Sequence, residues 1–434
     1  MFLRNKFSGG IHPPTYKELT QNCPIEEIPP PQKVVIPLIQ HIGGPCLPLV
    51  KSGEEVKLGQ KIGSSDKYIS SPVHASLAGK VSHIEDFNHP VLGKSPAIFI
   101  ERGQDSYTNA ISQKDPTGLS PEELKKIIQE AGIVGLGGAG FPTHVKLSPP
   151  KPIEVLILNA AECEPYLTCD ERLLCEKPSE ILKGLEIIIK IISPQEIFLG
   201  IEDNKEEAIG ILKNTLQAMG LTNKIKMVIL KTKYPQGGEK QLIKAITGKE
   251  VPSGGLPFDV GVLVQNVQTA FAIYEAVYKG KPLYERVITV SGKAIKKRGN
   301  FKVRIGTLVS EIVEFCGGFI ENPKKIIFGG PMMGIAQWSL EVPVIKGTSG
   351  ILFLSEEELN FEEPGPCIRC GRCIEVCPAK IMPASIALAG EYKRWNIVPQ
   401  YHPLDCIECG ACSYICPTRR DLVQFIKLAK QYGK

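Results

Sequence analysis

Short apolar runs separated by turn residues fill the chain from residue 33 to residue 101. In order, the runs are KVVIPLIQH, VKSGEEVKLGQKIG, SSPVHASLAGKVSHI and AIFIER. Runs of this length, bounded by Gly, Pro and Ser, are typical of β-strands. The pattern therefore predicts an all-β unit over residues 33–102, preceded by an N-terminal arm of residues 1–32.

The glycine and valine spacing of this unit resembles that of a known fold. V-x2-G-x2-V-x2-G-x2-I, followed by P-V-H-A-S-x2-G-x-V, is similar to the barrel-sandwich hybrid fold of biotinyl and lipoyl carrier domains. In such a carrier the modified lysine sits at a hairpin tip, where Asp66 and Lys67 stand here. The flanking residues lack the apolar residue and the charge pattern of a carrier, so we expect Lys67 to be an unmodified surface residue.

The hydrophobic pattern changes after residue 153, where apolar strands alternate with amphipathic helices. The predicted strands are IEVLILN, EIFLGIE, KIKMVILK and VGVLVQN. The predicted helices cover residues 179–192, 205–219, 238–246 and 269–278. This alternation predicts an α/β layer with a mainly parallel sheet.

Ligands of such sheets bind at the carboxyl ends of the strands. The first strand leads into NAAECEPYLTCDER, which places Asn159, Glu162 and Glu164 at that edge. The last strand leads into NVQT and places Asn266 and Thr269 at the same edge. For the two glutamates, a solvated acidic turn is the alternative to a ligand site.

A glycine loop precedes this layer, directly after a predicted helix with a capping box at Ser120 and Glu123. Within GIVGLGGAGFPTHVKL, three glycines match the dinucleotide-binding pattern G-x-G-x-x-G: Gly135, Gly137 and Gly140. A dinucleotide fingerprint has to follow a strand and open a helix, whereas this loop follows a helix and runs into Pro142. Because a glycine loop exposes backbone N–H groups, a nucleotide or flavin site and a plain turn both stay open.

No stretch of about 18 uncharged apolar residues occurs, and the N-terminus MFLRNKFSGGIHPP lacks the features of an export signal. We therefore expect a cytosolic chain that does not span a membrane by itself. The net charge is only +5, and no run of Lys and Arg is interleaved with aromatic residues. Nucleic-acid binding thus has no support from the sequence.

Fourteen cysteines in a chain without an export signal point to metal or redox chemistry. Eight of them fall into CIRCGRCIEVCP and CIECGACSYICP, which are offset by 39 residues and indicate an internal duplication. In the shared C-x2-C-x2-C-x3-C-P pattern, three cysteines of a block hold one 4Fe-4S cluster and the fourth holds the other. The predicted ligand sets are Cys367, Cys370, Cys373 and Cys416 for one cluster, and Cys377, Cys406, Cys409 and Cys412 for the other.

A pair of zinc sites is the alternative reading of the two blocks. Zinc sites are usually built from separated C-x2-C pairs, whereas each block here holds four cysteines and is followed by a proline, Pro378 or Pro417. The spacing therefore favours iron–sulfur clusters. The other six cysteines lack ligand spacing, and we expect them to be small buried residues; they are Cys23, Cys46, Cys163, Cys169, Cys175 and Cys316.

Three segments together resemble the flavin- and NADH-binding region of the flavin subunit of respiratory complex I. They are GLGGAGFPTHVK, NAAECEPYLTCDER, and YPQGGEKQLI with VLVQNVQTA. With GGIHPP near the N-terminus, the barrel-sandwich unit ahead and the cysteine blocks behind, essentially all 434 residues resemble the RnfC family of the Rnf electron-transport complex.

The resemblance implies which residues contact the cofactors. Those that would hold the phosphate end of FMN are Gly135, Gly137, Gly138, Gly140 and Lys146. Further flavin contacts would be Asn159, Glu162, Tyr234, Glu239, Asn266 and Thr269. Phe141 and Glu164 correspond to the place of the nicotinamide nucleotide. The complex I pattern has acidic residues where this chain has Ala161 and Gly238, so the hydrogen bonds to the flavin are expected to differ in detail.

The resemblance also implies a multidomain α/β fold class. In chain order, the expected parts are the arm (1–32), a β barrel-sandwich hybrid domain (33–102), an FMN- and NADH-binding α/β domain (115–283), a small β-grasp, soluble ligand-binding domain (284–345) and a C-terminal helical, ferredoxin-like two-cluster domain (355–434). Two clusters replace the single cluster of the flavin subunit of complex I, so the iron is organised differently.

The implied function is electron exchange between NADH, FMN and two 4Fe-4S clusters, in a peripheral subunit on the cytoplasmic side of the membrane. The implied partners are the other subunits of the complex and, indirectly, ferredoxin, with Na⁺ or H⁺ moved by the membrane subunits. No general acid or base is needed, so no catalytic residue is assigned. A flavin and iron–sulfur corrin reductase and a pure electron-relay module are the alternatives; GGIHPP and the domain order favour the Rnf family.

Overall fold

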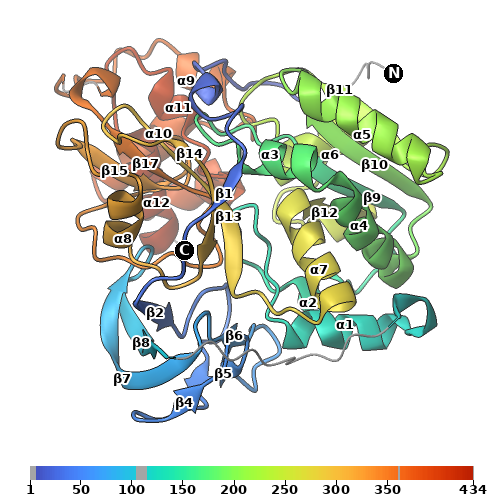
Figure 1. Ribbon diagram of the computed structural model, residues 1–434. Coiled ribbons are helices and arrows are strands. Elements are labelled where there is room, and N and C mark those ends of the chain that lie inside the picture. The colour runs from blue at the N-terminus through green and yellow to red at the C-terminus, as the bar shows by residue number, and fades with distance from the viewer. Residues whose placement is uncertain (1–5, 104–114, 360–361, 434) are drawn as a thin grey trace.

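The protein is described here by a computed structural model that covers residues 6–103, 115–359 and 362–433. Its strands form four sheets. Figure 1 shows the two small N-terminal sheets at the bottom, the parallel sheet on the right and the six-stranded sheet on the left.

Two antiparallel sheets make up the N-terminal β unit, with strand orders β2-β8-β7-β4 and β3-β5-β6. The strands are β2 (Lys33–Pro37), β3 (Leu47–Pro48), β4 (Glu55–Val56), β5 (Lys61–Ser64), β6 (Val73–His74), β7 (Gly79–His89) and β8 (Gly93–Arg102). Val34 and Ile36 of β2 and Ile98 and Ile100 of β8 are fully buried in one core. The predicted all-β unit is confirmed, and Lys67 is exposed in it.

A four-stranded parallel sheet with order β11-β10-β9-β12 follows, as the alternation of strands and helices predicts. Its strands are β9 (Val155–Ala160), β10 (Glu196–Glu202), β11 (Lys226–Leu230) and β12 (Val262–Asn266). The helices of this part are α1 (Pro121–Glu130), α2 (Thr143–Lys146), α3 (Cys169–Glu176), α4 (Pro178–Ile192), α5 (Glu206–Ala218), α6 (Glu239–Thr247) and α7 (Val267–Lys279).

Helices cover both faces of this sheet because its strands are apolar on both faces. On β9, Leu156 and Leu158 share a core with α4, α5 and α7. The alternate residues, Val155 and Ile157, pack in a second core with α6. With both faces covered, polar residues are left to the two edges of the layer, and ligands of such sheets bind at the carboxyl edge.

The third unit is a six-stranded mixed sheet with order β1-β14-β13-β17-β15-β16. Its elements are β1 (Ile25–Glu27), β13 (Glu285–Ser291), β14 (Gly299–Arg304), α8 (Val309–Phe315), β15 (Lys325–Phe328), β16 (Ile335–Gln337) and β17 (Gly350–Leu354). The sheet reaches beyond residues 284–345, because β1 comes from the N-terminal arm and β17 follows that segment.

The C-terminal part is helical and shows the duplication in three dimensions. Its helices are α9 (Arg372–Glu375), α10 (Pro383–Glu391), α11 (Ala411–Tyr414) and α12 (Leu422–Tyr432). The first residues of α9 and α11, and likewise of α10 and α12, are 39 residues apart, which is the offset of the cysteine blocks. The backbone repeats as well, since Gly371 and Gly410 have φ angles of 80° and 78°.

The N-terminal arm joins these units. The backbone N–H of Gly10 donates to the carbonyl of Val376 at 2.7 Å, and Ile11 forms a β-bridge with Tyr234. Short 3-10 helices complete the chain: η1 (Lys17–Leu19), η2 (Pro116–Gly118), η3 (Pro257–Val260), η4 (Glu356–Glu358), η5 (Val398–Tyr401) and η6 (Pro403–Asp405). Among the described residues, no helix combines the length and the apolar character needed to cross a membrane.

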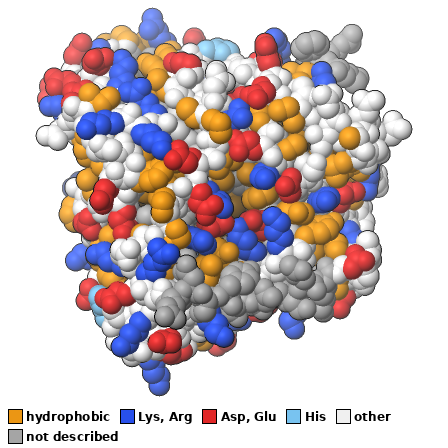
Figure 2. Space-filling view, in the orientation of Figure 1, with side chains coloured by type: hydrophobic (Ala, Val, Ile, Leu, Met, Phe, Trp, Pro, Cys, Tyr) orange, Lys and Arg blue, Asp and Glu red, His pale blue; other side chains and the backbone are white. Residues whose placement is uncertain are grey.

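Acidic and basic side chains are intermixed over the face shown in Figure 2, with apolar patches between them. This distribution matches the small net charge of +5. A ligand site on this chain therefore depends on local placement of polar groups rather than on a field of one sign.

Candidate functional site

The glycine loop between α1 and α2 closes on itself. The N–H of Gly135 donates to the carbonyl of Phe141 at 2.8 Å, and the N–H of Gly140 donates to the carbonyl of Gly135 at 3.0 Å. Gly138 and Gly140 have φ angles of 97° and 61°, a region where a side chain is strained. The local turn thus depends on glycine at these positions.

The loop lies against the start of α7, at the carboxyl edge of the parallel sheet. The N–H of Leu136 donates to the Thr269 hydroxyl at 2.9 Å. A Cβ atom added to Gly137 would lie 3.3 Å from Cβ of Asn266. The structure therefore brings the predicted glycines together with Asn266 and Thr269, although the loop follows a helix rather than a strand.

Asn159 and Asn266 are aligned with each other at the ends of β9 and β12. Asn159 Nδ2 donates to the Gly237 carbonyl at 2.9 Å, which draws the predicted segment YPQGGEK to the same edge. Asn266 is the N-cap of α7, where its Oδ1 accepts from the N–H groups of Gln268 and Thr269. Both asparagines thus have structural hydrogen bonds at the predicted site.

Glu162 and Glu164 are half-buried and hydrogen-bonded, so the sharp turn that carries them is not a freely solvated one. Glu162 has a φ angle of 44°. Its carboxylate accepts from the N–H groups of Asp170 at 2.8 Å and Glu171 at 3.2 Å, which supplies the cap that Thr168 does not provide to α3. Glu162 therefore positions α3 beside the site.

Glu164 connects the α/β unit to the six-stranded sheet and, through Tyr234, to the C-terminal part. Its Oε1 accepts from the Tyr234 hydroxyl at 3.2 Å, and its Oε2 accepts from the N–H of Met332 at 3.1 Å. Burial raises the pKa of the Glu164 carboxyl to about 7, against these hydrogen bonds, which lower it. The oxygen of the buried Tyr234 hydroxyl also lies 2.8 Å from the carbonyl oxygen of Cys409, so its single proton is shared between the two acceptors.

Two more predicted residues form an ion pair at one end of the site. Lys146 Nζ of α2 lies 2.7 Å from a carboxylate oxygen of Glu239, at the start of α6. Phe141, between the glycine loop and α2, is half-buried. Lys146 and Glu239 are thus close to each other, while Glu164 and Tyr234 lie at the end that faces the cysteine blocks.

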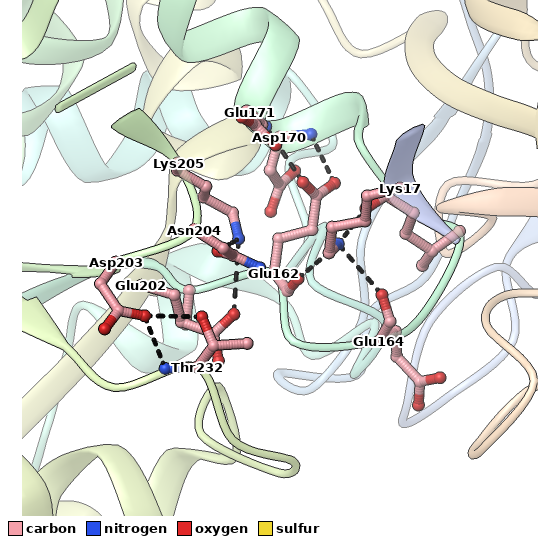
Figure 3. A network of polar contacts seen from close by, with 12 residues as sticks. Lys17, Glu162, Glu164, Asp170, Glu171, Glu202, Asp203, Asn204, Lys205 and Thr232 are labelled. Carbon is pink, nitrogen blue, oxygen red and sulfur yellow. Dashed lines mark hydrogen bonds and ion pairs between the residues drawn. The ribbon is translucent and has the colours of Figure 1, made fainter. Parts of the chain in front are cut away.

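A buried lysine network supports the acidic turn and is not foreseen in the sequence (Figure 3). Lys17 of the N-terminal arm is buried, and its Nζ donates to the carbonyls of Glu162 at 2.9 Å, Glu164 at 3.1 Å and Leu167. Burial lowers the pKa of Lys17, and the charge of Lys205 lowers it further. A single lysine in IHPPTYKELT has no pattern that marks it, so only the tertiary contact reveals it.

Lys205 and Glu202 form the neighbouring fully buried ion pair, with Nζ and Oε2 3.4 Å apart. In Figure 3 they lie on the other side of Glu162 from Glu164. Burial raises the pKa of Asp170 to about 6 and that of Glu171 to about 7. The arm and the α/β unit are therefore joined by buried charges directly behind the predicted flavin edge.

The residues present fit a flavin. Two buried side-chain amides in the predicted segments, Nε2 of Gln236 and Nε2 of Gln265, have no hydrogen-bond partner in the described structure. Buried donors left without partners are costly and usually mark a missing ligand or water. No atom lies within 4 Å of a Cβ added to Gly138, so the loop has open space beside it. Open space beside backbone N–H groups suits a phosphate or a ring.

The cysteines group as cross-ligation would require. Four thiols line one cavity, together with apolar side chains that include Ile381 and Val423; these thiols belong to Cys377, Cys406, Cys409 and Cys412. Burial raises the pKa of Cys409 to about 11, and the neighbouring thiols of Cys406 and Cys377 raise it further. The last cysteine of the first block thus lies with three cysteines of the second, in a lining that fits a cubane cluster.

The remaining block cysteines lie towards the surface. Burial raises the pKa of Cys373, and the thiols of Cys416 and Cys367 raise it further, so these three lie near one another. Cys370, the fourth predicted ligand of this set, is exposed. The ligand sets themselves remain predictions.

Comparison with protein families matches four parts of the chain. The matching models are described as the RnfC barrel sandwich hybrid domain (residues 5–105), the Nuo51 FMN-binding domain (128–275), the SLBB domain (287–336) and the 4Fe-4S dicluster domain (366–419). These matches confirm the predicted fold class. Two of them are an FMN-binding domain and a domain with two 4Fe-4S clusters, in agreement with the cofactors that the sequence predicts.

Curated relatives match nearly the whole chain. The C subunit of the proton-translocating ferredoxin:NAD(+) oxidoreductase complex of Clostridium ljungdahlii is 50% identical, over 99% of this chain and 94% of its own length. The C subunit of the Na(+)-translocating ferredoxin:NAD(+) oxidoreductase complex of Acetobacterium woodii is 45% identical, over 98% of this chain and 96% of its own length.

A solved structure shares the fold at low identity. A chain of an NAD+-reducing [NiFe]-hydrogenase in the H2-reduced state matches with a TM-score of 0.51 and 17% identity, over 73% of this chain and 61% of that chain. At this identity the likeness concerns the fold alone.

Proposed function

This chain belongs to the RnfC family, the C subunits of the ion-translocating ferredoxin:NAD(+) oxidoreductase complexes, and on that premise we propose how its residues serve electron exchange between NAD(H), FMN and two 4Fe-4S clusters. When bound, FMN takes up the two electrons of NADH together and releases them singly, as 4Fe-4S clusters require. The task of the protein is then to bind and orient, and no general acid or base is assigned.

The glycine loop and Lys146 are the proposed binding groups for the phosphate of FMN. The loop offers backbone N–H groups beside open space, and Lys146 supplies the positive charge. The other proposed flavin contacts surround the same sheet edge: Asn159, Glu162, Tyr234, Glu239, Asn266 and Thr269. Because Asn159 and Asn266 already hold backbone groups, they would act by keeping the edge rigid as well as by direct contact.

Phe141 and Glu164 are proposed to receive the nicotinamide nucleotide. Phe141 is half-buried next to the glycine loop and offers an aromatic face. Glu164 presents a carboxyl whose pKa is raised to about 7 by burial, so it is partly protonated at neutral pH and can donate as well as accept a hydrogen bond.

The two cluster ligand sets are proposed as predicted from the spacing. Cys377, Cys406, Cys409 and Cys412 line one apolar cavity, which supports the second set. The first set is supported by the proximity of Cys367 and Cys416 to Cys373.

One contact carries the proposal. The Tyr234 hydroxyl hydrogen-bonds both to Glu164, at the proposed nucleotide site, and to the backbone of Cys409, a proposed ligand of the second cluster. Through this one buried side chain, the flavin end of the protein touches the cluster end. Such a contact keeps the two ends close together, which favours transfer of single electrons between them.

The relatives support a place for this chain in a complex, because each of them is named as a subunit of one. We place the chain at the periphery of the membrane on its cytoplasmic side, held there by the other subunits. Ferredoxin would be reached indirectly, through those subunits.

The test is an anaerobic titration of the reconstituted chain with NADH, in the presence of FMN, followed by optical and EPR spectroscopy. We expect about eight iron atoms per chain, bleaching of the flavin and then signals of reduced clusters. Clusters that stay oxidised with NADH but are reduced by dithionite would contradict the proposal and leave the chain a relay module.

A further inference from the structure

The two cysteine blocks share one backbone but differ in how their surfaces are covered. Arg369 and Glu408, which correspond in the 39-residue repeat, have φ angles of 55° and 57°. Yet Ile368 is 61% exposed, whereas its counterpart Ile407 is half-buried. Cys370 is exposed, whereas its counterpart Cys409 is only 8% exposed. The exposure of each residue in the first block can thus be compared with that of its counterpart 39 residues later in the second block.

Other parts of the chain cover the second block. Ile11 of the arm and Tyr234 form one apolar cluster with Cys409 and Ala411, and Met332 packs against it. The contacts of Ile11, Tyr234 and Met332 with the second block therefore account for the burial of Cys409 and Ala411. The equivalent face of the first block has no such cover in the described structure.

Charges differ between the two faces in the same way. Glu408 is neutralised within the chain, since Lys430 Nζ lies 2.6 Å from its carboxylate. At the first block Arg369 and Arg372 are exposed, and neither forms an ion pair with any described residue. The counterpart of Arg372 is the fully buried Ala411. The first block therefore presents two guanidinium groups that pair with no described carboxylate.

Apolar side chains complete this face. Ile368 and Ile374 are 61% and 42% exposed, and they flank Cys370 and the two arginines in sequence. Exposed apolar residues combined with arginine are typical of the centre of protein interfaces. Free positive charge selects a partner whose surface is acidic, because unlike charges steer the encounter and like charges oppose it.

We propose that the loop of residues 367–374 is the docking surface for an acidic face of another subunit of the complex, one that carries a one-electron redox group. The inference rests on the proposed function, which makes the first block the end of the electron path that lies away from the flavin. In the exchange, one electron leaves the reduced first cluster, which is oxidised, and reduces the redox group of the partner; the reverse reaction returns it.

The repeat itself supplies a variant that should fold. Arg369→Glu with Arg372→Ala gives the first block the residues that the second block carries at the same backbone positions. A matched control is Lys213→Glu with Lys224→Ala, which makes the same change of charge at two exposed lysines that form no ion pair among the described residues. Lys213 lies on α5, which Figure 1 shows at the upper right, apart from α9 at the upper left.

The experiment measures binding of the reconstituted chain to membranes that have been washed free of this subunit. We expect the arginine variant to bind about tenfold more weakly than the control at low ionic strength, with the difference shrinking as salt rises. Iron content and the spectrum after dithionite reduction should match those of the unaltered chain. Equal binding of the two variants would overturn the proposal.

A second measurement separates this proposal from the proposed function. The chain is reduced with dithionite, freed of excess reductant and mixed with the washed membranes, so NADH takes no part. We expect reoxidation of the clusters to be slower for the arginine variant than for the control. Failure of the unaltered chain to be reoxidised would overturn the docking surface, whereas failure of NADH to reduce the clusters concerns the nucleotide site.

Discussion

At the scale of single residues, some side chains of the site cap helices, whereas others have no role at a helix end. Asn266 caps α7, and Glu162 caps α3, so replacing either would disturb a helix start as well as a cofactor contact. The carboxylate of Glu164 accepts from Tyr234 and Met332, and the residue lies at no helix end. It is therefore the better residue at which to separate binding from folding.

Glu164→Gln tests the state of this carboxyl. The folded protein releases the proton near pH 7 and an unfolded chain releases it near the ordinary value of 4.5. Between these values the folded state binds more protons, so stability from this group falls as the pH rises from 4.5 to 7. Glutamine does not titrate, and it should recover about 1–2 kcal/mol at pH 8, a figure reduced for the solvent contact of the side chain.

Urea unfolding at pH 5 and at pH 8 measures this effect. Glu55→Gln, at an exposed carboxyl, is the control and should leave the pH dependence unchanged. An unaltered pH dependence in Glu164→Gln would contradict the raised pKa. The same variant should slow reduction by NADH while sparing cluster assembly, and an unchanged rate would show that Glu164 is not at the nucleotide.

Cross-ligation is tested by combining cysteine variants. If Cys377 serves the second cluster, Cys377→Ser with Cys409→Ser removes ligands of one cluster only. Such a chain should keep about four of about eight iron atoms. Cys377→Ser with Cys370→Ser would damage both clusters and leave little iron. Iron analysis of the two double variants distinguishes these results. Little iron in Cys377→Ser with Cys409→Ser, and about four iron atoms in Cys377→Ser with Cys370→Ser, would refute the proposed ligand sets.

At the scale of elements, the glycine loop shows why a motif needs its context. Its glycines match G-x-G-x-x-G, but α1 precedes the loop and α2 is only one turn long, so the dinucleotide arrangement is absent. The loop is placed instead by hydrogen bonding of Leu136 to Thr269 at the start of α7. Leu136 and Thr269 are 133 residues apart along the chain.

Gly138→Ala tests whether the open space beside the loop is a flavin site. Gly138 has a φ angle of 97° and no atom within 4 Å of an added Cβ; Gly220, after α5, has a φ angle of 68° and the same empty surroundings. Both alanine variants should lose about 1–2 kcal/mol of stability through backbone strain. Only Gly138→Ala should also weaken FMN retention, measured by fluorescence of released flavin. Equal retention in both would place the flavin elsewhere.

At the scale of the whole molecule, one buried lysine joins three units. Lys346, from the segment before β17, donates from its Nζ to the carbonyls of Pro72 at 2.5 Å and Gly132 at 2.7 Å. Its backbone N–H donates to the side chain of Gln40 at 3.0 Å. The N-terminal β unit, the α/β unit and the six-stranded sheet therefore meet at this side chain.

Lys346→Met keeps the length of the side chain but removes the donor. Two buried carbonyls then lose their partner, and we expect unfolding to become easier by about 2–5 kcal/mol. Thermal unfolding compares it with Lys213→Met, an exposed lysine on α5 whose loss should have little effect. Coincident midpoints for the two variants would show that the units are held together by other contacts.

Sequence and structure contribute differently to this picture. The strands, the helices and the offset of 39 residues follow from local spacing, since periodicity and turn residues act over a few positions. The resemblance of short segments suffices to name the cofactor classes. The residue assignments for FMN and NADH remain predictions from that resemblance, and the cluster ligand sets remain predictions from the cysteine spacing. The exact division into domains likewise remains a prediction.

The sequence by itself determined the order of the folded units, the paired cysteine blocks and the family, because each is written in residues close together along the chain. Only the tertiary structure decided that Lys17 anchors the acidic turn and that Tyr234 joins Glu164 to Cys409. It also decided that, among the described residues, the second of the two repeated cysteine loops is covered and the first is exposed. These contacts arise between segments far apart in the chain, and burial and charge pairing there depend on how the units pack rather than on any local pattern.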